Sequence, residues 1–376
     1  MVTESQVREA LRNVLDPEIG RPIEDLGMLE RIEVDGDLVR VHVLLTIAGC
    51  PLQERITGDV RAALAPLGVE RVEVRMTPMS EEQRAALVAK LRGPRAAAAQ
   101  PQQRTFFTDG STSVIAVASG KGGVGKSSVT VNLACALAAE GHRVGVLDAD
   151  VWGFSVPRML GVSGQPVGFN NMILPLESHG VKVISMGFFV PEDTPVIWRG
   201  PMLHKAIEQF LGDVYWGDLD FLLVDLPPGT GDVSISLASF LPGAAMLVVT
   251  TPQEAARRVA ERAGKMAERT NLRPIGVIEN MSFFVCPHCG EQVRIFGEGG
   301  GREAAETLGV PLLGEIPLVV ELREGGDTGT PIVVSHPDSP AGVVLREAAR
   351  RVAQAVRTKV GRPLPLLTGP GAAHAH

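Results

Sequence analysis

A single loop constrains the fold of this chain more than any other stretch of its sequence. Residues 120–127 read GKGGVGKS and match the phosphate-binding pattern G-x-x-x-x-G-K-[ST]. The β-branched run SVIAVAS (113–119) precedes the loop, and a helix-forming run (127–140) follows it. Such a strand–loop–helix unit turns backbone N–H groups and a helix N-terminus toward a phosphate. The loop therefore predicts a nucleotide-binding α/β domain.

Further apolar runs follow the loop and alternate with helical segments. They read RVGVLDAD (143–150), FLLVDLPP (221–228), AMLVVTTP (245–252), PIGVIEN (274–280) and PLLGEIP (311–317). Nearly continuous apolar strands between helices indicate a mostly parallel sheet that is buried on both faces. Ligands of such sheets bind at the carboxyl ends of the strands. We therefore predict a P-loop NTPase fold, with its site at that edge.

The residues of the loop and of two strand ends suit nucleotide hydrolysis. We expect Lys126 to reach the β- and γ-phosphates, and Ser127 and Asp225 to bind Mg²⁺. Asp150 is the candidate for orienting the attacking water, with Asp148 as its support. The predicted nucleotide-binding residues of the loop are Gly120, Lys121, Gly122, Gly123, Val124, Gly125, Lys126, Ser127 and Ser128.

The chain divides into a small N-terminal unit and a larger domain. Residues 1–92 predict a compact αββαβ unit of the α+β class, whose hairpin turns at Asp35 and Gly36. Residues 93–112 are rich in alanine, glutamine and proline and predict a linker. The ATPase domain is expected over 113–365, and a disordered tail over 366–376. Phe106 and Phe107 are either docked on a neighbouring element or partly exposed.

Composition narrows the range of partners. The chain has 376 residues and a formal net charge of -7, which argues against bulk electrostatic binding of nucleic acid. The first residues lack the pattern of a signal peptide, and no apolar run is long enough to cross a membrane. We expect a cytoplasmic protein that binds neither nucleic acid nor membrane.

Two thiols lie close together in the sequence CPHCG. Cys286 and Cys289 have the spacing of a metal-binding pair, but a tetrahedral zinc or a four-iron cluster needs about four protein ligands. Cys135 falls inside the predicted helix behind the loop, where a small core residue is expected. The count suggests that two chains contribute two cysteines each. A zinc site or a redox dithiol remains an alternative to a cluster.

The early lysine of the loop carries a resemblance. GKGGVGKS, with Lys121, resembles the deviant Walker A ATPases, a group that includes the MinD/ParA proteins and the nitrogenase iron protein. In that group the early lysine reaches across a dimer to the nucleotide of the other subunit. The resemblance thus implies a homodimer in which Lys121 acts in trans, as an arginine finger does.

Other segments point to one family within this group of ATPases. DADVWGFSVP, WRGPM, VDLPPGTGD, IENMS and CPHCG, within residues 113–360, resemble the Mrp/ApbC/Nbp-type iron–sulfur cluster carriers. Phe154 stands where that family usually has proline, a departure that bears on the conformation of the loop and removes no ligand. The resemblance implies ATP rather than GTP, with Asn280 reading the base. It also implies a labile 4Fe–4S cluster that bridges two subunits through Cys286 and Cys289.

The N-terminal unit carries a resemblance of its own. LDPEIG, DLGM and the pair Cys50-Pro51 resemble the small domain of SufT- and PaaD-like iron–sulfur assembly factors. Cys50 precedes a predicted helix, where a thiol is either reactive or merely buried. Asp16, Glu18 and Asp25 are candidates for the same surface.

Together these features predict an ATPase, with slow hydrolysis, that carries iron–sulfur clusters from donors to apo-protein clients as a homodimer. The alternative is a MinD/ParA-type organiser that acts on membrane or DNA. Its candidate contact is the basic amphipathic segment 343–360, which we interpret instead as a final helix packed on the sheet. An electron-transfer ATPase like the nitrogenase iron protein is less favoured, because that type uses single, widely separated cysteines.

Overall fold

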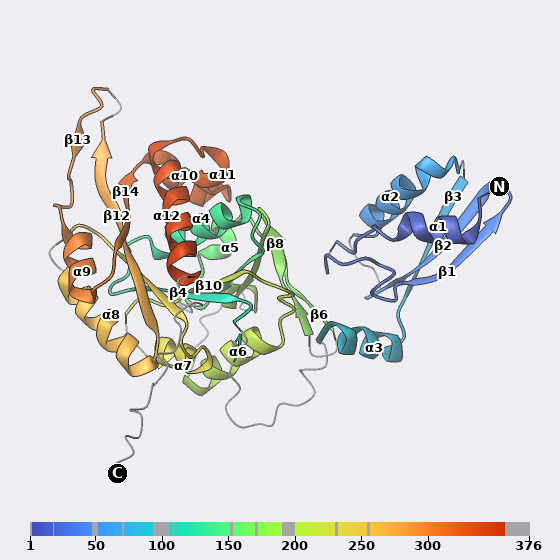
Figure 1. The fold of residues 1–376 in the computed structure, drawn as a ribbon, viewed down its shortest axis with the longest axis horizontal. Helices are drawn as coiled ribbons and strands as arrows, with labels where there is room; N and C mark the ends of the chain where they lie inside the picture. Colours follow the sequence, from blue (N-terminus) through green and yellow to red (C-terminus); the bar gives the residue numbers. More distant parts are fainter. Residues whose placement is uncertain are drawn as a thin grey trace, which may run out of the picture.

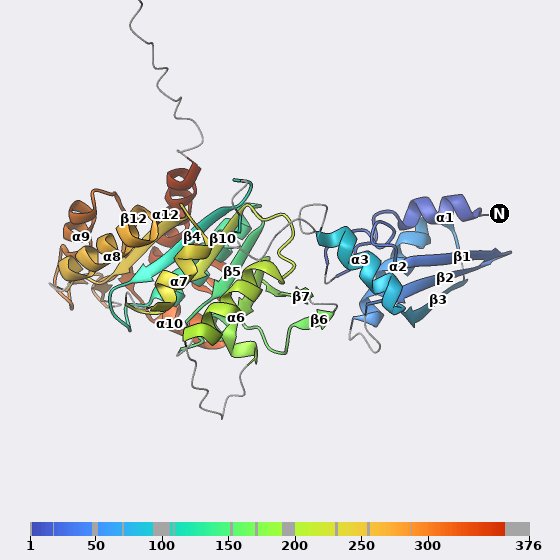
Figure 2. The same ribbon diagram turned by 90° about the horizontal axis from the view of Figure 1, so that it is seen from below.

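The computed structural model of the chain describes residues 2–17, 19–46, 52–69, 71–92, 106–107, 110–150, 153–169, 172–189, 200–229, 232–253, 256–286 and 288–357. These residues form a large C-terminal domain and a smaller N-terminal unit beside it (Figures 1 and 2). None of the described helices is long and apolar enough to cross a membrane.

A nine-stranded sheet forms the centre of the large domain, in the order β13-β12-β11-β4-β10-β5-β9-β8 with β14 also paired to β12. Among the described residues, only the pairs β8–β9 and β12–β13 of this sheet are antiparallel. The predicted P-loop NTPase fold with a mostly parallel sheet is confirmed. The strands are β4 (Ser113–Ser119), β5 (Val144–Asp148), β8 (Leu176–Ser178), β9 (Val181–Ser185), β10 (Phe221–Asp225), β11 (Ala245–Thr250), β12 (Arg273–Val285), β13 (Gln292–Val293) and β14 (Leu312–Leu318).

Helices cover both faces of this sheet, which explains why its strands are apolar throughout (Figure 1). One face packs against α4 (Lys126–Ala139), α5 (Val156–Met159), α10 (Val320–Thr328), α11 (Ile332–Ser335) and α12 (Pro340–Arg357). The other packs against α6 (Gly200–Gly212), α7 (Asp232–Phe240), α8 (Ala256–Thr270) and α9 (Gly300–Leu308), with the 3₁₀ turn η3 (Met186–Phe189) nearby. The apolar side of α12, including Leu345 and Val352, is buried in this core, as the sequence predicts for a final helix.

The N-terminal unit has its own core. A three-stranded sheet of β1 (Leu29–Asp35), β2 (Leu38–Leu45) and β3 (Arg71–Pro78) packs against α1 (Glu4–Leu11) and α2 (Gln53–Leu64). The short η1 (Ala65–Leu67) follows α2, and α3 (Glu81–Arg92) adds a helix that the αββαβ prediction lacked. Strand β1 is antiparallel to β2, whereas β3 is parallel to it.

A small hairpin of the large domain contacts the N-terminal unit. Strands β6 (Val167–Phe169) and β7 (Met172–Leu174) pair with each other, and Met172 and Leu174 are buried in the core of the N-terminal unit (Figure 2). The predicted linker lies mostly outside the described residues, but Phe106 packs on Phe240 at 6.1 Å between ring centroids. The predicted tail, 366–376, also lies outside them.

Candidate nucleotide site and cysteine hairpin

The strand register brings the predicted carboxylates together. Asp225, at the end of β10, is paired in register with Asp148 of β5 on one side and with Val117 of β4 on the other. The phosphate loop starts three residues beyond Val117. Because all three strands are parallel, their carboxyl ends meet at one edge of the sheet, where the loop also lies.

Two glycines of the loop allow close packing. A Cβ on Gly120 would stand 2.5 Å from the Val259 side chain of α8, so only glycine fits there. Gly125 precedes α4 with φ 77°, in the left-handed region that favours glycine. A Cβ at that position would also meet the Asn280 amide. The loop is therefore held between α8 and β12.

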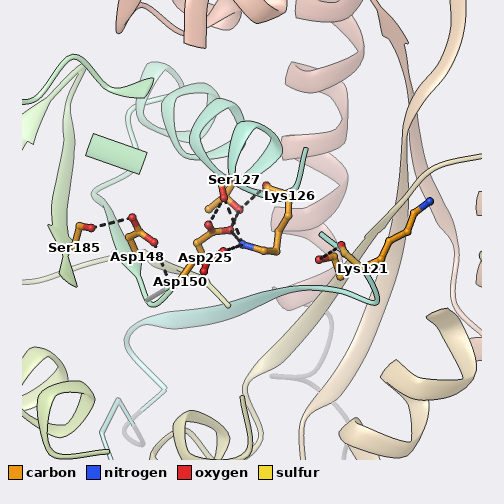
Figure 3. Close-up of polar contacts among 9 residues, drawn as sticks. Lys121, Lys126, Ser127, Asp148, Asp150, Ser185 and Asp225 are labelled. Carbon is orange, nitrogen blue, oxygen red and sulfur yellow. Dashed lines mark hydrogen bonds and ion pairs between the residues drawn. The ribbon is translucent and has the colours of Figure 1, made fainter. Parts of the chain in front are cut away.

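Lys126, Ser127 and Asp225 are in direct contact (Figure 3). The Lys126 Nζ lies 2.8 Å from Asp225 Oδ1, and the Ser127 hydroxyl donates a hydrogen bond to Asp225 Oδ2. Thr130 Oγ1, one turn along α4, donates to Asp225 Oδ1 at 2.9 Å. A carboxylate beside hydroxyl groups is the oxygen donor set that suits Mg²⁺, and the lysine supplies a cation for phosphate.

Asp148 and Asp150 differ in their surroundings. Asp148 is fully buried and accepts hydrogen bonds from Ser185 Oγ at 2.9 Å and from the Asp150 backbone N–H at 3.2 Å. Burial and the nearby Asp225 carboxylate raise the pKa of Asp148 to about 8. Asp150 is closer to solvent, with Oδ2 4.0 Å from the Lys126 Nζ. The geometry therefore places Asp150 at the site and Asp148 behind it.

Lys121 extends away from this cluster (Figure 3). Its Nζ donates a hydrogen bond to the side-chain carbonyl of Gln253, in the loop that follows β11. Its backbone carbonyl accepts a hydrogen bond from the Ser119 hydroxyl at 3.1 Å. Within one chain, Lys126 thus contacts Asp225, whereas Lys121 contacts Gln253.

A mostly apolar cavity of about 270 Å³ adjoins the end of the phosphate loop. Asn280 is almost fully buried at its wall and donates a hydrogen bond from Nδ2 to the Val124 carbonyl at 2.9 Å. The structure gives Asn280 Oδ1 no hydrogen-bond partner, which leaves one acceptor free. The lining comprises Gly125, Ser128, Ser155, Arg158, Met159, Asn280, Met281, Pro317, Leu318, Val319, Leu322, Arg323, Gly326 and Asp327.

Strands β12 and β13 form a hairpin that projects from the sheet (Figure 1), and the cysteine pair lies in the turn between them. Strand β12 continues past the end of β11, Cys286 follows its last residue, and β13 returns antiparallel to it. Two backbone bonds close the turn, from Cys286 N–H to Glu291 O and from Gly290 N–H to Cys286 O, both at 2.9 Å. Cys286 is half-buried and Cys289 is exposed, and both are free thiols.

The turn favours the metal-binding form of the first thiol. Hydrogen bonds from the backbone N–H groups of Cys289 and His288 lower the pKa of Cys286. A thiolate, not a thiol, ligates metals. Across the described residues, no group of three or more His, Cys, Asp or Glu side chains could hold a metal ion. Within the described residues, the hairpin thus offers two thiols and no third side chain of these types beside them.

The remaining cysteines are less informative. Cys135 is buried in α4, and burial raises the pKa of its thiol to about 12, as for a core residue. Cys50 and Glu18 lie outside the described residues. Asp16 is buried and accepts a hydrogen bond from the Ile19 N–H at 2.8 Å, which makes it part of a turn, whereas Asp25 is exposed.

Sequence reasoning missed several residues at the nucleotide site. Thr130 and Ser185 bind the carboxylates, Gln253 binds Lys121, and the segment after β14 forms one wall of the cavity. One available signal was the apolar run 311–317, whose end must lie at the same sheet edge as the phosphate loop if the sheet is parallel.

Phe154, the departure from the family pattern, packs on Gly187.

Comparisons with known proteins agree with this geometry. Residues 110–353 match the family model described as NUBPL iron-transfer P-loop NTPase, and residues 4–76 match the model described as iron–sulfur cluster assembly protein. The iron–sulfur cluster carrier protein of Mycobacterium leprae is 51% identical over 370 residues, with 96% of each chain covered. Its namesake from Mycobacterium tuberculosis H37Rv is 52% identical over 372 residues, again with 96% of each covered.

A solved structure is also similar to the large domain. The nucleotide-binding protein of Archaeoglobus fulgidus, in complex with ADP, is 39% identical with a TM-score of 0.53. The match covers 58% of this chain and 88% of that one. Together with the full-length relatives and the family model over most of the sequence, it confirms the predicted resemblance: the chain belongs to the iron-transfer P-loop NTPase family.

Proposed function

We propose that this protein carries iron–sulfur clusters to apo-proteins and that its ATPase site controls the carrier. One observation carries the proposal: β12 joins the two sites, because Asn280 lines the cavity beside the phosphate loop and Cys286 follows the end of the same strand. The names of the full-length relatives, iron–sulfur cluster carrier proteins, support the same function.

The contacts of the nucleotide site support specific roles. Lys126 binds the β- and γ-phosphates, the cavity takes the nucleoside of ATP, and the free Asn280 oxygen accepts from the base. Ser127 and Asp225 are the residues that would hold Mg²⁺, which neutralises charge on the phosphates when bound. Asp150 orients the attacking water, and Asp148 holds the Asp150 backbone in place.

The cysteine pair and Lys121 support a homodimer. Two thiols per chain make half of a four-cysteine site, so two chains would share one 4Fe–4S cluster as cargo. Lys121 points away from its own phosphate site, and it would have to exchange its bond to Gln253 for the nucleotide of a partner. Exposed apolar side chains on the loop after β5, on η3, α6 and α7 suit burial between two copies: Phe154, Phe189, Met202 and Ile235.

Anaerobic reconstitution with iron and sulfide tests the cargo. Wild-type protein should gain a four-iron chromophore, and Cys286→Ser should lose it together with the bound iron while still binding nucleotide. The matched control is Cys135→Ser, which changes a buried thiol away from the hairpin and should keep the chromophore. Full iron content in Cys286→Ser would overturn the ligand assignment. Tight zinc without a chromophore in the wild type would favour a structural metal site.

A further inference from the structure

Strand β12 carries residues of both sites. It runs from Arg273 to Val285, with Asn280 beside the phosphate loop and Cys286 just beyond its end. Cys286 lies five residues beyond Met281, which corresponds to about 17 Å of extended chain. A change of backbone direction near Met281 would therefore move the thiols more than it moves the loop.

Met281 has an unusual backbone conformation for a strand. Its φ is 59°, in the left-handed region that residues other than glycine rarely adopt. The pairing with β14 slips at the same place, because Asn280 lies opposite Ile316 and Phe284 lies opposite Leu318. Four steps along β12 thus match two along β14, which makes a bulge. Strain of this kind persists where the surrounding structure enforces it.

The two sides of the bulge are held differently. On the loop side, the Glu279 carboxylate accepts a hydrogen bond from the Gly301 N–H at 2.5 Å, and Asn280 binds the Val124 carbonyl. On the hairpin side, Phe284 pairs with Leu318 of β14 and with β13, and Val285 pairs with β13. The loop side is therefore anchored by side-chain hydrogen bonds, whereas among the described residues β12 has no pairing beyond Phe284 except with β13.

The Met281 side chain lies where a nucleotide in the cavity would touch it. It forms part of the cavity wall, and its Cε lies 3.8 Å from the point where a Cβ would stand on Gly125. A flexible thioether in such a wall repacks readily around a ligand.

We propose that Met281 is the joint through which a nucleotide in the cavity repositions the cysteine hairpin. This inference rests on the proposed function, because it requires nucleotide in that cavity. A nucleotide that contacts the Met281 side chain binds one backbone state of the bulge better than the other, and it shifts the population of hairpin positions accordingly. Met281 acts through the hairpin and is a positioning residue, not a ligand of the cargo.

Thiol reactivity in the metal-free protein tests the inference without any iron. The rate at which iodoacetamide alkylates Cys286 and Cys289 is followed by peptide mass spectrometry, without nucleotide and with saturating ADP or a non-hydrolysable ATP analogue. In the wild type we expect nucleotide to change this rate by about fivefold. Met281→Gly removes both the side-chain contact and the unfavourable conformation, and should reduce the change to less than about 1.5-fold.

Two variants serve as controls. Met281→Leu keeps an apolar contact and the same backbone, and should retain most of the response. Asn271→Gly places glycine at another left-handed position, φ 53°, just before β12, and should respond as the wild type does. A full response in Met281→Gly, or none in the wild type, would overturn the inference. Failure of iron reconstitution would instead count against the proposed cargo and leave this assay interpretable.

Discussion

The phosphate loop and the cysteine hairpin differ in how completely one chain builds them. The loop lies between buried strands, and its lysine and its hydroxyl already have partners on Asp225. The hairpin extends beyond the sheet, and it offers two thiols where a cluster needs about four ligands. A site enclosed by the fold can be preorganised, whereas the thiols of a projecting hairpin are accessible from outside the domain.

The largest expected effect is that of Lys126→Gln, which should change the phosphate loop and leave the cysteine hairpin unaffected. Lys126→Gln removes the cation that faces Asp225 and should lower the ATP hydrolysis rate by about a thousandfold, because phosphate charge is no longer neutralised. Iron content after reconstitution should stay near that of the wild type, because the hairpin is untouched. Steady-state phosphate release and iron analysis measure the two quantities. A parallel loss of iron would mean that the regions are not separable.

Lys121→Ala tests whether even the enclosed site is incomplete in one chain. The rate should fall by about a hundredfold, whereas Gln253→Ala, which removes only the Lys121 partner, should have a small effect. Mixing Lys121→Ala with Lys126→Gln should restore about one quarter of wild-type activity, because half of the dimers are mixed and each has one complete site. If mixing restores nothing, Lys121 does not act in trans.

Thr130→Val tests how far the enclosure of the loop depends on buried hydrogen bonds. The hydroxyl donates to Asp225 at 2.9 Å, and its loss should lower the free energy of unfolding by about 1–2 kcal/mol. Urea denaturation without nucleotide measures the change. Thr130→Ser keeps the donor and should cost less; equal losses in both variants would point to packing rather than to the hydrogen bond.

The smallest effects come from a matched pair of glycines. Gly123 in the loop and Gly290 in the hairpin have φ values of 78° and 73°, and a Cβ at either would have no neighbour within 4 Å. Alanine at either position should therefore meet no neighbouring atom, and it should cost only the strain of a left-handed backbone, about 1 kcal/mol. In ligand binding this corresponds to a loss of about fivefold. Gly123→Ala should weaken nucleotide binding and Gly290→Ala iron retention. If either change weakened both, the two regions would be coupled through more than β12.

Much of the nucleotide site could be predicted because its signals are local. The loop motif lies between a β-branched strand and a helix, and Asp148, Asp150 and Asp225 close apolar runs. The N-terminal unit was predicted without α3, and the hairpin β6–β7 was not predicted at all. Strands of three residues, such as β6 and β7, are too short to show an alternating pattern. In α3 the buried apolar residues Leu87 and Val88 are adjacent, which gives no helical period.

Sequence by itself determined the parallel sheet, the phosphate loop and the presence of an incomplete cysteine pair, because each follows from residue types at fixed spacing along the chain. Tertiary structure alone decided that Thr130, Gln253 and the residues after β14 belong to the nucleotide site. It also decided that one strand bears both Asn280 and the cysteine turn, with Met281 strained between them. Such relations depend on strand order and register, which bring together residues that no local pattern connects.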